Sequence, residues 1–114
     1  AQSLVVNGGE FVSIYQASLP NSETGHIEQS LCERHFCKNC ATALWVWDPR
    51  WPELIHPFAS AVDTELPMPT ERTHLMLEAK SSWIDPKIGD SDQCFDGYPQ
   101  ESIAEWHERL GVER

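Results

Sequence analysis

Two cysteines separated by two residues, Cys37 and Cys40, are the feature of this sequence best suited to chemistry. In a C-x-x-C pair, both sulfurs can bind one zinc ion at about 2.3 Å while the backbone between them turns beneath it. Such a pair is half of a tetrahedral site, which needs two more ligands. The spacing therefore predicts a zinc ion at Cys37 and Cys40.

The same spacing also occurs in dithiol redox proteins and in thiols that bind nothing. In a redox protein the motif begins a helix, whose N-terminus lowers the thiol pKa. Here Ala41 and Thr42 are followed by ALWVW at 43–47, a run typical of a strand. A strand after the motif favours metal, and the two other interpretations stay open.

The remaining zinc ligands are not fixed by spacing. Cys32 would extend the motif to C-x4-C-x2-C, and His35 or His26 could complete a self-contained Cys3His site. If 27–36 is a strand that leads into the motif, Cys32 and Cys37 lie about 16 Å apart, too far to share one ion without a sharp bend. We therefore expect Cys32 to be a small buried apolar side chain.

Composition and charge describe a small acidic globular protein. A chain of 114 residues with 40% hydrophobic content can bury an apolar core within one domain. Its net charge of -10 opposes both a phosphate backbone and an anionic lipid surface. Neither a signal peptide nor a membrane-spanning stretch is visible, so we expect a cytoplasmic protein without nucleic-acid or membrane partners.

Without a secretory context, free thiols or metal are favoured over disulfides, and we expect Cys94 to be buried.

Short strands make up most of the predicted secondary structure. β-branched and aromatic residues that alternate with a period of two predict the strands, and clusters of Gly, Pro, Asn and Ser predict the turns between them. The run at 73–79 also fits a helix, because its apolar residues satisfy either period. The predicted strands are 11–17, 27–36, 43–47, 54–59 and 73–79, and the predicted loops are 63–71 and 81–99.

One helix is predicted, at 100–110. Pro99 suits the start of a helix and Gly111 suits its end. Ile103, Trp106 and Leu110 fall on one stripe of the helix surface. The sequence therefore predicts a mainly β fold of short antiparallel strands, with a C-terminal helix that packs through one apolar face.

The run RHFCKNCATALWVWDP at 34–49 resembles the C-terminal part of the glutathione-dependent formaldehyde-activating enzyme family, whose domain also occurs in centromere protein V. The similarity extends over about 11–98 and includes a later segment at 80–83. It implies a β-tent fold of antiparallel strands and a single zinc-binding domain over 1–114. The residues that carry the F-C-x-x-C-x-x-x-L-W core are Phe36, Cys37, Cys40, Leu44 and Trp45.

The resemblance also implies two zinc sites. The family's C-x-x-C, here Cys37 and Cys40, is half of a structural site whose other half is an upstream C-x-C, and a catalytic zinc binds an upstream C-x-C-x-x-C. Neither upstream motif occurs in these 114 residues, so we expect a domain that lacks its N-terminal segment or has lost that site. Ala41 stands where the family usually has glycine in a left-handed turn position, which alanine adopts at a cost of about 1 kcal/mol.

Two functions from different classes follow. The resemblance implies a zinc-dependent carbon–sulfur lyase that acts on glutathione or other thiol–aldehyde adducts, with its catalytic ligands outside this sequence. The alternative is a non-catalytic, zinc-stabilised β module for protein interaction that has lost the catalytic zinc. The basic side chains of Arg34, His35 and Lys38, which flank the cysteine pair, could attract an anionic thiol or could form a solvated loop face.

Overall fold

The structure is a computed structural model that describes residues 4–112. Its contacts divide the chain into two compact units, Ala1–Leu66 and Pro67–Arg114, which are described separately below. Across the described residues, no helix has the length and apolar character needed to cross a membrane.

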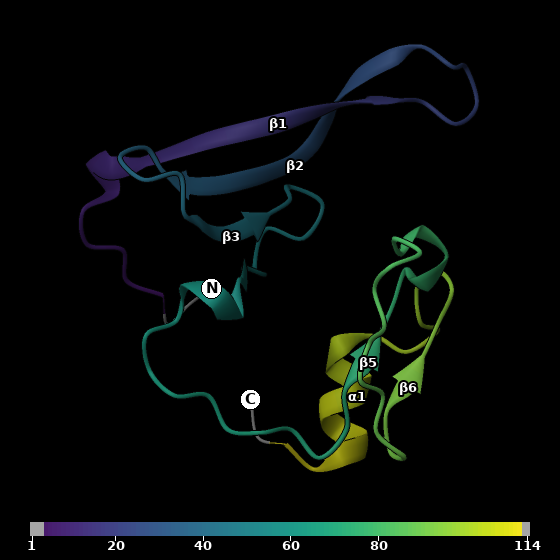
Figure 1. Cartoon of the computed structure of the whole chain (residues 1–114). Coiled ribbons are helices and arrows are strands. Elements are labelled where there is room, and N and C mark those ends of the chain that lie inside the picture. Colours follow the sequence, from purple (N-terminus) through teal and green to yellow (C-terminus); the bar gives the residue numbers. More distant parts are fainter. Residues whose placement is uncertain (1–3, 113–114) are drawn as a thin grey trace. The chain divides into compact units, whose positions relative to one another are not determined.

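The N-terminal unit is built on one sheet of four antiparallel strands (Figure 1). Each strand pairs with the next one along the chain, so the sheet is a meander joined by short connections. The strands are β1 (Val12–Pro20), β2 (Ile27–Cys37), β3 (Ala43–Trp47) and β4 (His56–Pro57).

The turn between β1 and β2 is fixed by Asn21. Its side-chain oxygen accepts the backbone N–H groups of Glu23 and Thr24 at 2.9 and 3.0 Å. An Asn side chain that bonds its own following backbone in this way stabilises a turn. The resulting hairpin runs the whole length of β1, so that Val12 pairs with Cys37 at its far end.

β3 has the bounds that the sequence predicts, and two tryptophans join it to its neighbours. Trp45 lies opposite His35 of β2, and their rings stack with centroids 4.9 Å apart. The indole N–H of Trp47 donates to the carbonyl of Pro52 at 3.2 Å, which holds the segment after β3 against the strand. Both contacts use aromatic groups at the sheet surface rather than inside a closed core.

Carboxylates are the most deeply buried residues. Asp48 and Glu71 are each 8% exposed, whereas no apolar residue in the described part of the chain is buried to that degree. Arg50 donates to Asp48 through both its Nε and its Nη2, at 2.8 and 2.6 Å. This hydrogen-bonded guanidinium lowers the pKa of Asp48 to about 2. The composition indicated that the chain can bury an apolar core. In the described residues, however, the most buried side chains belong to ion pairs.

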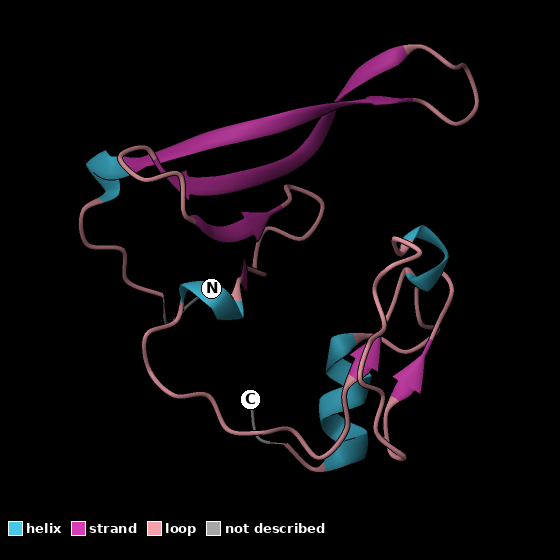
Figure 2. Cartoon of the chain, in the orientation of Figure 1, coloured by secondary structure: helices cyan, strands magenta, loops and turns pink. Residues whose placement is uncertain are grey.

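The C-terminal unit contains two short strands and one helix (Figure 2). β5 (Thr73–His74) and β6 (Gln93–Cys94) pair in parallel, whereas the sequence predicted mostly antiparallel strands and placed residues 93–94 in a loop. The helix α1 (Ile103–Leu110) begins three residues later than predicted, because Ser102 and Glu105 form a capping box at its start. Gly111 ends α1 with a left-handed φ of 65°, as the sequence indicates.

Two other predicted strands are only partly correct. Of the segment 54–59, only the two residues of β4 are strand, and a 3-10 turn, Ala59–Ala61, begins within it. Of the segment 73–79, only β5 is strand, and a 3-10 turn, Leu77–Ala79, ends it. The mainly β prediction with one C-terminal helix is confirmed.

Asp92 organises the start of the C-terminal unit. Its carboxylate accepts the backbone N–H of Gly89 at 2.8 Å, the backbone N–H and side chain of Arg72, and the imidazole of His74 at 3.1 Å. These hydrogen bonds, that of Gly89 first, hold the pKa of Asp92 well below its ordinary value. One carboxylate thus ties β5 to the loop that precedes β6.

We expect the stability of the protein to fall as the pH is lowered through about 4, because Asp92 titrates. Its folded-state pKa lies below its unfolded value of about 3.9, so its contribution is present above that value and is lost as the pH falls below it. Urea unfolding between about pH 6 and pH 2.5 measures this. Asp92→Asn should flatten the acid limb, whereas Asp90→Asn, an exposed neighbour, should leave it unchanged. Equal acid limbs in the two variants would contradict this role of Asp92.

Candidate metal centre

Cys37 and Cys40 lie in the closed turn that joins β2 to β3. Cys37 is the last residue of β2, and its backbone N–H donates to the carbonyl of Thr42 at 2.9 Å. In return its carbonyl accepts the N–H of Ala41 at 2.7 Å. The strand after the motif is confirmed as β3, so no helix begins at the cysteine pair. The backbone at the cysteine pair is a closed turn followed by a strand, which differs from the helix start of a redox motif.

Ala41 has the left-handed conformation expected at this position. Its φ is 60°, and it is one of two non-glycine residues with positive φ in the part of the chain that the structure describes. A β-carbon in this region collides with the neighbouring carbonyl oxygen. The turn therefore keeps its geometry at a steric cost that glycine would remove.

Thr42 holds the thiol of Cys40 by its side chain. The Sγ of Cys40 is 3.1 Å from the hydroxyl oxygen of Thr42. Hydrogen bonds from the Thr42 side chain first, then from its backbone and from Cys37, lower the pKa of the Cys40 thiol. Since the thiolate is the form that binds metal, the turn favours the reactive form of this ligand.

The other candidate ligands lie elsewhere. Cys32 is half-buried and lies five positions before Cys37 in the same strand β2, where the rise of an extended chain corresponds to about 16 Å. His26 lies in the turn at the opposite end of the β1–β2 hairpin. Cys94 belongs to β6 in the C-terminal unit and is exposed, so the prediction that it is buried was wrong.

His35 is occupied by other contacts. Its Nε2 shares a hydrogen bond with the Glu33 carboxylate at 3.1 Å, and its ring stacks on Trp45. Among residues 4–112, no three side chains of His, Cys, Asp or Glu meet as a metal site would need. Cys37 and Cys40 therefore fit half of a tetrahedral site, and the structure brings none of the other candidates to them.

An apolar pocket lies beside the cysteine pair. Its volume is about 380 Å³, and Cys37, Phe11, Trp45 and the segment 4–8 line it. The ammonium group of Lys38 is 6.0 Å from the centre of the Phe11 ring, which places one positive charge next to the pocket. The pocket was not predicted from the sequence. The apolar run LVV at 4–6, which forms part of its lining, could have indicated an apolar site there.

We expect Ala41→Gly to stabilise the fold by about 1 kcal/mol, because glycine adopts a positive φ without the steric cost. Urea unfolding of the two proteins measures the difference. Ala43→Gly, two residues later at the start of β3, is the matched control and should destabilise by about 0.5–1 kcal/mol, since glycine weakens a strand. A loss of stability in Ala41→Gly would show that the left-handed turn does not exist in solution.

Comparison with known proteins assigns the chain to a family. No family model matches it, and no solved structure matches it. The chain is 58% identical over 113 residues, which are 99% of its length and 68% of the relative, to a protein of Halomonas elongata with the provisional name glutathione-dependent formaldehyde-activating enzyme. Identity at this level over nearly the whole chain shows common descent and confirms the resemblance centred on the cysteine motif. The chain belongs to the glutathione-dependent formaldehyde-activating enzyme family.

Proposed function

We propose that Cys37 and Cys40 bind a structural zinc ion in a zinc-dependent carbon–sulfur lyase that acts on glutathione or other thiol–aldehyde adducts. The observation that supports a bound metal is the closed turn around the cysteine pair, with Ala41 in a left-handed conformation. The name of the Halomonas elongata relative supports the substrate class.

The two thiolates supply half of the structural ligand set. Both come from one turn, so binding an ion would tie the end of β2 to the start of β3. The family resemblance assigns the other two ligands to a C-x-C, and these 114 residues contain none. Cys37 and Cys40 thus have a structural role in this proposal, and no catalytic residue is assigned.

The proposed reaction forms or breaks one carbon–sulfur bond. In the forming direction the thiolate sulfur of glutathione attacks the aldehyde carbon, the carbonyl π electrons move to oxygen, and that oxygen takes a proton. In the lyase direction the hydroxyl proton leaves, the carbonyl re-forms, and the thiolate departs. A catalytic zinc, when bound, would lower the pKa of the thiol so that the thiolate is available at neutral pH.

Lys38 is the described residue best placed to help an anionic substrate approach. Its side chain lies beside Phe11, which lines the pocket next to Cys37. In a protein with a net charge of -10, a cation at a pocket creates a local attraction for the carboxylates of glutathione. Lys38 would act on the encounter with substrate and not on the chemical step.

A second candidate function is an interaction module stabilised by zinc. The observation that favours it is the absence of any C-x-C-x-x-C among the 114 residues, which leaves them without the family's catalytic ligand motif. In that case the cysteine pair would still hold the fold together, and glutathione would have no site.

We expect Cys37→Ser and Cys40→Ser each to abolish zinc retention and lower the melting temperature, because bound structural zinc contributes folding free energy directly. Native mass spectrometry of the purified proteins counts the zinc ions. Cys32→Ser and Cys94→Ser are matched controls and should keep the zinc content of the unmodified protein, since neither lies at the turn. Zinc retained in both Cys37→Ser and Cys40→Ser, or lost in all four variants, would exclude the proposed pair.

Zinc content and response to glutathione separate the lyase from the module. The protein expressed from its complete open reading frame should hold two zinc ions if it is the lyase. It should then also accelerate the exchange between free glutathione and its formaldehyde adduct, which NMR exchange spectroscopy follows. One zinc ion at most, no acceleration, and a melting temperature unaffected by glutathione would instead establish the module.

A further inference from the structure

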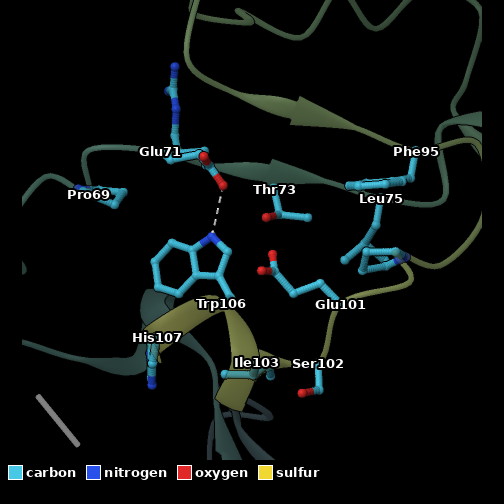
Figure 3. Close-up of a pocket in the computed structure, with 12 residues that line it drawn as sticks. Pro69, Glu71, Thr73, Leu75, Phe95, Glu101, Ser102, Ile103, Trp106 and His107 are labelled. Atoms are coloured by element: carbon cyan, nitrogen blue, oxygen red, sulfur yellow. Dashed lines mark hydrogen bonds between the residues drawn. The ribbon is translucent and has the colours of Figure 1, made fainter. Parts of the chain in front are cut away.

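The C-terminal unit contains a pocket that the proposed function does not use. Its volume is about 430 Å³, within the range of pockets that bind small molecules. Every residue that lines it belongs to the unit Pro67–Arg114, so neither cysteine of the proposed zinc site contributes. The pocket lies between the β5 segment and the start of α1 (Figure 3).

The walls of the pocket are largely apolar and aromatic. Trp106 and Ile103 face it from α1, and Leu75 and Phe95 face it from the segments that follow β5 and β6. The indole of Trp106 is held in place, since its N–H donates to Glu71 at 3.1 Å. This hydrogen bond fixes the position of the aromatic ring at the pocket wall.

The charges at the pocket do not balance. The single guanidinium of Arg109 binds two carboxylates, donating to Glu71 at 2.6 and 3.0 Å and to Glu101 at 2.7 and 2.8 Å. One positive charge therefore serves two negative ones. Arg109 lowers the pKa of Glu101, and the charges of Glu71 and of Glu105, which lies in the capping box outside the pocket lining, oppose this effect.

The guanidinium that lines the pocket, that of Arg72, does not correct this excess. Arg72 is paired with Asp92, whose side chain is only 4% exposed, so these two charges cancel locally. His107 also lines the pocket. At pH 7.5 the pocket therefore combines aromatic walls with an uncompensated negative charge.

We propose that this pocket binds a small organic monocation, an ammonium group on an apolar or aromatic body. The ammonium would lie near Glu101, which is 30% exposed and whose carboxylate points between Trp106 and Thr73 in Figure 3. The body would contact Phe95 and Ile103, and the ring of Trp106 would add a cation–π contribution. Glutathione adducts carry a net negative charge and do not fit this chemistry, so the ligand differs from the proposed substrate.

Three ligands of similar size and different charge test the proposal on the full chain at pH 7.5. They are phenethylammonium, 2-phenylethanol and 3-phenylpropionate, and the readout is the indole N–H cross-peak of Trp106 in a ¹⁵N-correlated NMR titration, assigned with Trp106→Phe. The cation should bind about tenfold more tightly than the neutral alcohol, and the anion more weakly than both. Equal affinity for cation and alcohol, or no shift with the cation, would overturn the proposal.

Two charge-matched variants locate the effect. Glu101→Gln removes the excess charge at the pocket and should reduce the preference for the cation to near unity while leaving the affinity for 2-phenylethanol unchanged. Glu108→Gln makes the same change of charge at an exposed position of α1 outside the lining and should keep the preference. Thermal unfolding without ligand verifies that both variants fold. If both variants lose the preference equally, general charge and not this pocket is responsible.

Discussion

The closed turn between β2 and β3 is the constraint on which the N-terminal unit depends. Its two backbone hydrogen bonds reverse the chain within a few residues, which brings β3 into register with β2 and places Trp45 on His35. The same turn contains both cysteines of the motif. Because Ala41 keeps a left-handed conformation that glycine would adopt without a steric cost, the turn is held by its hydrogen bonds and not by local preference.

Buried ion pairs are the second organising feature, and they occur in both units. Asp48 pairs with Arg50 in the segment that follows β3, and Asp92 pairs with Arg72 next to β5 in the C-terminal unit. Hydrogen-bonded pairs of this kind are directional, so they fix geometry where apolar contacts are incomplete. A buried carboxylate needs an opposite charge beside it. The folding stability therefore depends more strongly on acidic pH than it would with an apolar core alone.

Local sequence patterns were reliable where one element was defined by its own residues. The alternation in 43–47 gave β3 without error, and Gly111 marked the end of α1. Pro99 indicated a helix start at residue 100, but α1 begins at Ile103, directly after the N-cap Ser102, whose capping box with Glu105 sets the start. The strand at 73–79 was mostly wrong, because its apolar run fits either period and only its pairing with β6 selected the two residues that became strand.

The sequence by itself determined the family, the mainly β class and the cysteine pair at the candidate site, because a ligand motif of four residues is a local property of the chain. It also predicted that Cys32 lies too far from Cys37 to share one ion, from the rise per residue of an extended strand, and β2 contains both residues. Only the tertiary structure decided that β5 and β6 run parallel, that His35 bonds Glu33 and stacks on Trp45, and that Glu71 and Glu101 share Arg109 beside a pocket. Glu71 is separated from Trp106 and Arg109 by 35 and 38 residues, and no local pattern specifies which distant groups will meet.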